Sequence, residues 1–355
     1  MKHVFSTIIS TLAIGCLFSQ ATFSSPTNEQ LDSRIKALEK RTPKPSNNTE
    51  IFDTLSIHGT FRPTLVVHDN GNDTSYDVGD ALSRIGFKGS LPITDGLEAI
   101  FEGEWSIDIS DNGDFGKSRK AYVGLKSNYG TIAIGKQRTP HYLLIAEPVD
   151  IFNHANSPFA YDNVGTFFAN NQISYRYYFD HFQFLGAIQT NGSEGDDKAD
   201  IVNFGASYTI HDWYIATAYL SQTIPFTADA LEEGNELTNI AVTTSYSFNS
   251  FYIAAAYQKL ENDTDANDID GHTIDISGSM KFANNKIKIG IFEYDDGLKS
   301  VSKEHRGWNI TFEKQLNPQF RAHIEYLYKD FEIPEADNQN TIAIGFRYDF
   351  ERNMN

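Results

Sequence analysis

The sequence predicts an all-β protein, a transmembrane antiparallel β-barrel of about sixteen strands, and three features of the chain support this. Segments of strand length alternate apolar and polar residues from residue 54 to the end. Their connections alternate between short turns and long loops. The mean hydropathy of -0.40 is too polar for a helical membrane protein, whereas aromatic residues reach 13%. Each element is justified below in chain order.

Residues 1–21 have the features of a secretory signal peptide. Lys2 and His3 precede an apolar run over 4–18, and Ser19-Gln20-Ala21 provides a cleavage site of small residues. A run of about 15 apolar residues is too short to span a bilayer well, so export is favoured over anchoring. The stretch "LAIGC" is a weaker match to a lipoprotein site. Cleavage would remove Cys16, the only cysteine, and with it any disulfide or thiolate site.

Residues 22–50 are expected to form a periplasmic helical or coiled-coil segment and a linker. Within residues 27–41, Leu31, Ile35 and Leu38 follow a heptad-like spacing behind a capping box. The pattern allows either a short solvated helix or a helix that associates with copies of itself.

Residues 51–355 make up the predicted barrel, because their strands have one apolar and one polar face. The last strand, "IAIGFRYDF" (342–350), places Ile344 and Phe346 on one face and Arg347 on the other. In a β-sandwich the apolar faces would meet in a dry core. Here the polar faces are too charged for that, so we expect apolar residues to face lipid and polar residues to face water inside. The predicted lumen acids are Glu98, Glu102 and Glu104.

The connections between strands fall into two classes. The short ones lie at 92–96, 127–130, 179–181, 210–212, 248–250, 283–285 and 316–319. The long ones lie near 69–80, 108–117, 137–170, 190–200, 221–237, 259–271, 295–306 and 329–340. Short periplasmic turns and long outer loops are typical of outer-membrane barrels. We therefore expect an integral outer-membrane protein with extracellular loops and both termini in the periplasm.

The charge and motifs exclude several functions. The formal net charge of -18 makes nucleic acid a poor partner. The signatures Gly-x-Ser-x-Gly and His-Glu-x-x-His are absent, so no enzyme is predicted. The stretch 262–271 resembles a calcium loop, but Asp268 replaces the required Gly, so no metal or cofactor is expected. The acidic loops are expected to contact lipopolysaccharide phosphates through divalent cations.

Three stretches resemble the general porins of Gram-negative outer membranes. They are "LSRIGFKGSL" (82–91), "SRKAYVGLKSNYGTIAIGKQ" (118–137) and "GFRYDF" (345–350), which resemble the second strand, the fourth strand to the fifth, and the terminal strand. The resemblance implies a homotrimer of sixteen-stranded barrels. It also implies a third loop folded into each pore, whose acids face arginines on the wall. The chain departs from the family in the "ERNMN" tail after Phe350.

The resemblance also implies the residues of a pore constriction. Arg84 and Arg119 match two wall arginines, and Arg62 lies two residues from a basic position of the first strand. A further arginine is expected near 170–172, where this chain has "NNQ", and Arg176 in the inward register is its candidate replacement.

The third loop corresponds to about residues 138–168. Its acids are Glu147, Asp150 and Asp162, of which Asp150 is nearest to the family's loop acid. The family's Pro-Glu-Phe-Gly tip is replaced by "VDIFNHANSPF" (149–159).

The charge pattern gives an independent reason for two of these wall residues. An arginine costs little in a water-filled lumen and a few kcal/mol facing lipid. Arg84 has the inward register, because Ile85 occupies the other face. Arg119 can be read either way, and this alternation places it inside only if Tyr122 faces lipid. Cations opposite loop carboxylates would create a transverse field that favours polar solutes.

The sequence therefore predicts an outer-membrane channel for passive diffusion of small hydrophilic solutes and ions. One alternative is a substrate-selective porin for sugars or anions, and another is a non-conducting adhesin or structural barrel. The acidic loops favour a weak preference for cations, which the wall arginines oppose.

Overall fold

The computed structural model describes residues 54–354, apart from 112, 155–165, 191–199, 224–235, 263–268, 298–303 and 332–337. The predicted signal peptide (1–21), the predicted helical segment (22–50) and Asp162 lie outside these residues. The chain divides into two units, Met1–Ile51 and Phe52–Asn355, and the second contains everything described below. In the described part of the chain, no helix has the length and hydropathy to cross a membrane.

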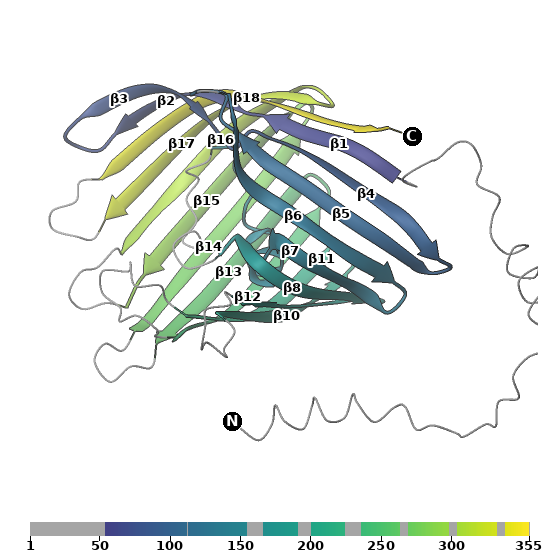
Figure 1. Cartoon of the computed structure of the whole chain (residues 1–355). Coiled ribbons are helices and arrows are strands. Elements are labelled where there is room, and N and C mark those ends of the chain that lie inside the picture. The colour runs from purple at the N-terminus through teal and green to yellow at the C-terminus, as the bar shows by residue number, and fades with distance from the viewer. Residues whose placement is uncertain are drawn as a thin grey trace, which may run out of the picture. The chain divides into compact units, whose positions relative to one another are not determined.

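The described residues form eighteen strand segments in one antiparallel sheet that closes on itself (Figure 1). The first half comprises β1 (Thr54–Phe61), β2 (Pro63–Asp69), β3 (Thr74–Asp80), β4 (Arg84–Thr94), β5 (Leu97–Ile107), β6 (Phe115–Ser127), β7 (Gly130–Arg138), β8 (Phe168–Phe179) and β9 (Phe182–Gln189). The second half comprises β10 (Ile201–Ile210), β11 (Trp213–Thr223), β12 (Glu236–Phe248), β13 (Phe251–Asn262), β14 (Ile269–Phe282), β15 (Asn285–Asp295), β16 (His305–Asn317), β17 (Phe320–Phe331) and β18 (Gln339–Asn353).

The last strand closes the barrel. β18 pairs with β17 on one edge and with β1 and β2 on the other. β1 with β2, and β3 with β4, are two interrupted strands, so the barrel has sixteen strands and the predicted fold class is confirmed. A closed sheet leaves no unpaired edge in the bilayer.

The interruption of the first two strands is a local irregularity in the ladder. The Ala81 amide donates a hydrogen bond to the Arg62 carbonyl at 2.8 Å, and the Arg62 amide donates to Ser83 Oγ at 2.8 Å. Leu82 takes a φ of 70°, a left-handed conformation that is unusual for a branched residue. Such irregularities redirect neighbouring side chains. Here the irregularity lies between Arg62 and Arg84, two residues of the predicted constriction.

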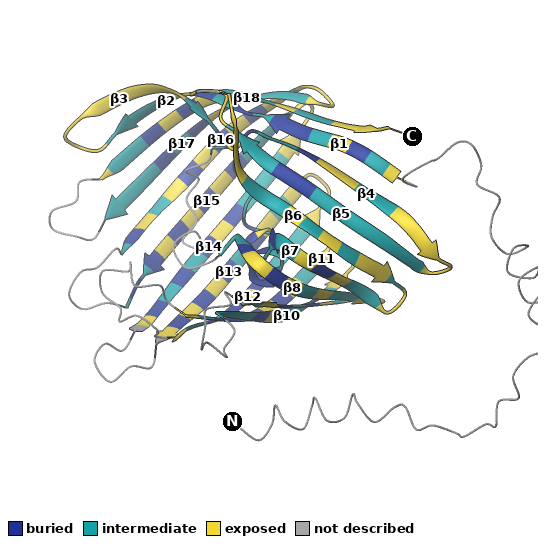
Figure 2. Ribbon diagram, viewed as in Figure 1, coloured by how far each residue is buried: buried dark blue, intermediate teal, exposed yellow. Residues whose placement is uncertain are grey.

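The two faces of the wall follow the predicted alternation, which Figure 2 shows as alternating buried and exposed residues along the strands. In β18, Ile344 on the outer face is 52% exposed and Ala343 on the inner face is 1% exposed. Near the short turns the outer face carries exposed aromatic side chains, including those of Phe179, Trp213, Phe248 and Phe251. Aromatic residues at the border of an apolar band are typical of barrels in a membrane.

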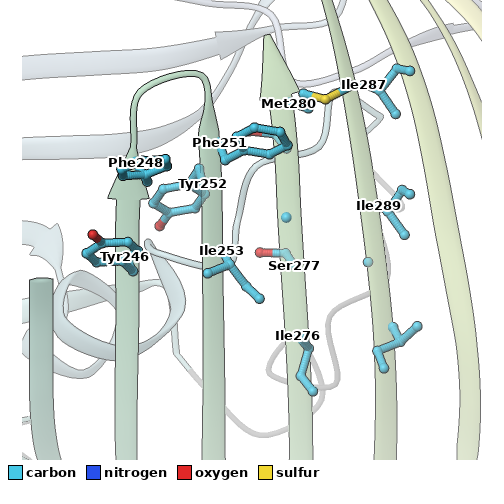
Figure 3. Close-up of a pocket in the computed structure, with 14 residues that line it drawn as sticks. Tyr246, Phe248, Phe251, Tyr252, Ile253, Ile276, Ser277, Met280, Ile287 and Ile289 are labelled. Carbon is cyan, nitrogen blue, oxygen red and sulfur yellow. The ribbon is translucent and has the colours of Figure 1, made fainter. Parts of the chain in front are cut away.

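The outer wall also contains an apolar groove of about 710 Å³ over β12 to β15 (Figure 3). The side chains of Phe248, Phe251 and Met280 lie near one turn, and those of Ile253 and Ile289 lie further along the strands. Gly278 is part of the lining, and its missing side chain leaves space on this face.

The seven short turns are confirmed, and left-handed residues such as Gly96, Asp180 and Asn249 build several of them. The prediction of a long loop over 69–80 was wrong, because most of this stretch is strand β3. A tight turn at 70–73 joins it to β2, and Asn70 Oδ1 accepts the amides of Asn72 and Asp73. Tyr76 and Val78 continue the exposed outer face there, although their neighbours are polar.

The tail after Phe350 extends the terminal strand. Glu351, Arg352 and Asn353 pair with residues 56–58 of β1, and Lys88 Nζ lies 2.9 Å from Glu351 Oε1. These residues therefore add to the ladder that closes the barrel.

Candidate functional site

The described part of the third loop, residues 139–154 and 166–167, folds into the barrel, and its first half packs against one side of the lumen. Its short π-helix, η1 (Tyr142–Ala146), contacts β10, β11 and β12. Leu144 and Ile145 are fully buried against small inner residues such as Ala218 and Ala254. We call the inner face of β9 to β13 the loop wall. Its alanines leave the space that the loop fills, so apolar burial holds the loop there.

Side chains of the loop wall also bind the backbone of the loop. Tyr214 donates its hydroxyl to the Leu144 carbonyl at 3.0 Å, and Thr243 donates to the Ile145 carbonyl at 2.8 Å. Tyr252 donates to the Pro148 carbonyl at 2.6 Å. Buried carbonyls must be paired, and here the wall supplies the donors.

Further along, the loop contacts β16 and β17, where two buried glutamates hold it. Glu325 on β17 accepts the amides of Asn153 at 3.0 Å and His154 at 3.2 Å. Glu313 on β16 accepts the Asn153 side chain at 3.0 Å and pairs with Lys288 at 2.9 Å. The described stretch 139–154 is therefore held both by the loop wall and by β16 and β17.

His141 at the start of the loop is completely buried. Burial lowers its pKa to about 4, and a hydrogen bond with Asn239 partly opposes this shift. Asn239 in turn donates to Gln258 Oε1 at 2.9 Å. A neutral histidine is thus part of the polar contacts behind the loop.

The loop acids lie between the walls. Asp150 accepts the Tyr142 hydroxyl at 2.7 Å and is half-buried. Glu147 is exposed to the lumen space. Burial within the barrel raises the pKa of Glu147, the cation Arg138 opposes this, and the nearby Asp150 adds to it.

The opposite inner wall carries the predicted arginines. Glu104 on β5 pairs with Arg84 Nε at 3.4 Å and with Arg119 Nε at 2.9 Å. His58 Nε2 lies 3.4 Å from the same carboxylate. Strands β1, β4 and β6 thus direct basic side chains to one buried acid on β5, and Arg84 and Arg119 lie together.

Arg119 is inside for a reason that alternation does not reveal. Tyr122 also faces the lumen, because its hydroxyl donates to Glu102 at 2.8 Å, so the condition that Tyr122 faces lipid is not met. The register between β5 and β6 shifts between Glu104 and Trp105, which pair with Lys120 and Ser118. The extra residue is Arg119, and this bulge turns it inward.

Arginines that the sequence analysis did not select extend this cluster. Arg321 and Arg347 face each other on β17 and β18, and both pair with Asp349. Arg138 at the end of β7 lies over the rings of Tyr142 and Phe168. We call Arg321, Arg347, Arg62, Arg84, Arg119 and Arg138 the arginine row. The inward alternation of β17 and β18 was the signal that could have identified Arg321 and Arg347.

The remaining predicted residues lie outside the row. Arg176 has the inward register of β8 but lies nearer the turn, level with Thr131, and forms no ion pair within the described residues. Glu102 pairs with Lys120 at 2.8 Å, and Glu98 pairs with Lys126 at 3.4 Å near the turn. All three predicted lumen acids are thus paired with lysine or arginine. Their roles, and those of the wall arginines and loop acids in a constriction, stay predictions.

Among the described residues, two groups of side chains have the spacing of metal ligands. They are His58, Glu102 and Glu104, and Asp295, Asp296 and Glu304. In the first group, both carboxylates already pair with lysine or arginine, which competes with a cation. The second lies where β15 ends and β16 begins.

The arrangement gives the lumen two unlike sides. One is covered by the third loop with its acids, and the other is the arginine row. If the predicted constriction lies here, a solute that passes between them meets carboxylates on one side and guanidinium groups on the other. The predicted field would order water and favour polar solutes over apolar ones.

Comparison with known proteins agrees with the fold. A family profile described as Gram-negative porin matches residues 46–334. A protein named monosaccharide porin from Halomonas sp is 27% identical in an alignment of 235 positions that covers 59% of this chain and 64% of that protein. The match thus spans less than two thirds of that relative.

Two solved structures have the same fold. The anion-selective porin from Comamonas acidovorans has a TM-score of 0.73 and 17% identity, covering 83% of this chain and 99% of that one. The trimer form of OmpT, an outer membrane protein of Vibrio cholerae, has a TM-score of 0.66 and 20% identity, covering 84% of this chain and 99% of that one.

Proposed function

Because the chain belongs to the Gram-negative porin family, we propose that it is an outer-membrane channel for passive diffusion of small hydrophilic solutes and ions. The observation that carries this proposal is the pair of unlike inner walls. The loop is seated on alanines at one side, and the charged residues gather at the other. A plugged or purely structural barrel gives no reason for this separation.

The membrane arrangement follows from the two classes of connection. In this proposal the short turns and both termini lie in the periplasm, and the long acidic loops face outward and contact lipopolysaccharide. The signal peptide of residues 1–21 directs export.

We assign the active form as a homotrimer. The outer faces of β1, β4, β5 and β18 suit contact with other copies, because aromatic rings lie over glycines there. A Cβ at Gly59 would meet the Phe350 ring at 2.6 Å, and one at Gly103 would meet the Trp105 ring at 2.5 Å. Rings that lie flat over glycines give a smooth apolar surface. The trimer form of the Vibrio cholerae structure agrees with this assignment.

The proposed function is transport without chemistry. The lumen groups that resemble catalytic residues, such as His58 and Glu104, are held in contacts with one another and with arginines. Their role in this proposal is to set the field of the pore.

Ion preference depends on two charge sets at different depths. The acidic loops act at the mouth, where salt screens them within about 10 Å at 0.1 M. In the described residues, four of the six arginines of the row form ion pairs, and they share three carboxylates, Glu104, Glu313 and Asp349. We therefore propose a weak cation preference at low salt that fades, and turns towards anions, as salt rises.

A substrate-selective channel is the second candidate. The arginine row favours anions, and the name of the Comamonas structure agrees with that preference. The name of the Halomonas relative favours sugars instead. A non-conducting adhesin remains the candidate of another class.

Planar-bilayer recording of the purified protein tests these candidates together. A diffusion channel gives steady, ohmic steps whose current grows with salt concentration. Saturation by one sugar or anion would replace general diffusion with selective transport. Folded protein that gives no steps would refute the channel and leave the adhesin.

A further inference from the structure

One glycine leaves the apolar groove over β12 to β15 hollow. Gly278 lies in the outer register of β14 and pairs with Ile253 of β13 and with Ile289 of β15. These two isoleucines line the groove and are 55% and 53% exposed (Figure 3). Apart from its chain neighbours, a Cβ at Gly278 would meet only the Tyr252 carbonyl, at 3.3 Å. The groove therefore has a floor of backbone between two aliphatic ridges.

Glycines elsewhere on the outer wall are covered by the chain itself. The rings of Phe350 and Trp105 lie over Gly59 and Gly103, in the sector proposed for contact between copies. Within the described residues, no ring covers Gly278. The groove thus lies on a different part of the wall from that sector, and its hollow is open to a group from outside the chain.

A thin hydrocarbon chain fits this hollow better than it fits a smooth wall. Lipid tails are as apolar as the wall, so burial of apolar surface does not by itself hold a lipid in one place. Dispersion contacts do, and a gap forfeits them. An acyl chain that lies over Gly278 contacts the Ile253 and Ile289 side chains at both flanks, whereas on a smooth wall it contacts protein on one side only.

A lysine lies at the turn end of the groove. Lys314 on β16 shares the outer face with Phe312, which is 41% exposed. Phe312 pairs with Ile287, a residue of the groove, and Lys314 pairs with Asn285. Lys314 is therefore a diagonal neighbour of Ile287 on the same face, and residues in such positions are about 7–8 Å apart, within reach of long side chains.

Lys314 has no counter-charge from the described part of the chain. It is exposed and forms no ion pair or hydrogen bond there. The other lysine and arginine on the outer face of β13 to β16 are Lys259 and Arg306, which pair with Glu261 and Asp330. A lysine on the lipid side is tolerated near the border of a membrane, where its ammonium group meets head groups. The unpaired cation therefore points to an anionic head group beside the groove.

We propose that the groove binds one acyl chain of an anionic glycerophospholipid whose phosphate pairs with Lys314. Such a lipid carries both the apolar chain that the hollow accepts and the negative charge that the lysine lacks. The inference rests on the proposed orientation, in which the short turns lie in the periplasm. It goes beyond the proposed function, because it concerns the outer wall and not the lumen. The inner leaflet supplies glycerophospholipids at this end of the barrel, and lipopolysaccharide lies at the other.

Native mass spectrometry of the folded protein in detergent tests the site and requires no conduction. The probes are phosphatidylglycerol and phosphatidylcholine with the same acyl chains. Gly278→Leu fills the hollow and Lys314→Gln removes the cation, and Met280→Trp fills the same groove should Gly278→Leu not fold. The first control is Gly186→Leu, on the outer face of β9, where the nearest atom to a Cβ lies at 3.9 Å. The second is Lys281→Gln, which is exposed and lies beside the turn between β14 and β15.

The wild type is expected to retain one phosphatidylglycerol per barrel, more tightly than phosphatidylcholine, whose choline cation offsets the charge of its phosphate. Lys314→Gln weakens the binding of phosphatidylglycerol about tenfold, the loss of one charge-assisted contact, and that of phosphatidylcholine less. Gly278→Leu weakens the binding of both lipids alike, and the two controls retain them as the wild type does.

Equal retention in Gly278→Leu and Gly186→Leu, or displacement of phosphatidylglycerol by lipopolysaccharide, would overturn the site. Loss of oligomer mass in Gly278→Leu would overturn it too, because the groove would then hold a second copy. A barrel that binds the lipid but gives no current in bilayers would refute the channel alone, and a conducting barrel that does not bind the lipid would refute only this site.

Discussion

The two inner walls of this barrel differ in what they are built to hold. The loop wall presents Ala218, Ala254 and other small residues and buries the apolar side of the third loop. The opposite wall presents long basic side chains, which are held by partners such as Glu104 and Thr60. The comparison teaches that one closed sheet can hold the third loop with one part of its inner face and carry the charged residues on another part. Small residues seat the loop on one wall, and the arginine row lies on the other.

The largest expected effect comes from disrupting the apolar contact between the third loop and the loop wall. Ile145→Asp puts an unpaired carboxylate into a fully buried apolar contact, which costs several kcal/mol. The loop then leaves its wall, and single-channel recording shows fluctuation among several current levels instead of one. Ile145→Val is the matched control and costs about 1 kcal/mol without changing the current. A steady wild-type current in Ile145→Asp, with the barrel still resistant to heat in detergent, would mean that the loop does not depend on this wall.

The next effect comes from releasing the far end of the loop. Glu325→Ala removes the acceptor of the Asn153 and His154 amides, and each buried donor left unpaired costs about 1–3 kcal/mol. We expect more frequent closures in bilayer recordings at neutral pH. Glu325→Gln keeps one oxygen and lies between wild type and Glu325→Ala. Equal closing rates in all three proteins would remove Glu325 from the account.

A smaller effect, a change in reversal potential whose direction is predicted, tests the wall that carries the arginine row. Arg84→Ala moves the reversal potential in a salt gradient towards cation preference, and raises conductance if Arg84 lines the narrowest section. Glu104→Gln moves it in the opposite direction, because it leaves Arg84 and Arg119 without their shared carboxylate. Shifts of the same sign in the two variants, or no shift in either, would show that this cluster lies away from the path of ions.

The smallest effect concerns pH. Burial behind the loop lowers the pKa of His141 from its usual 6.5 to about 4. The folded loop therefore favours the neutral imidazole. Its contribution to stability is therefore complete above about 6.5 and is lost as the pH falls towards 4. Current noise is expected to rise across this range in the wild type and to rise less in His141→Gln. The same acid response in both proteins would assign it to other groups, such as Glu147.

The fold could be predicted largely because lipid imposes a strict pattern. In β18 the alternation of Ile344 with Ala343 and Arg347 allowed only one assignment of faces, and the left-handed turn residues marked the short connections. Strand β3 was missed because its residues are mostly polar, and its pairing depends on the hairpin with β2.

The site was less accessible to sequence reasoning because it depends on irregularities. Arg119 faces inward through a bulge that breaks the alternation, and Arg62 lies at an interruption between two strands. Arg321 and Arg347 are far from Arg62 in sequence and become its neighbours only when the barrel closes. The glutamates that hold the loop, Glu313 and Glu325, could not be paired with it before the loop's path was known.

The most direct test of the two-walled channel is the accessibility of single cysteines to a charged thiol reagent during bilayer recording. The only native cysteine is Cys16 in the predicted signal peptide. Once that segment is removed, the introduced cysteine is the only thiol that the reagent can modify. The account predicts that Arg84→Cys is modified and its current falls, whereas Ala254→Cys behind the third loop is protected and its current is unchanged. Equal modification of the two positions, or modification of Arg84→Cys without any change in current, would contradict it.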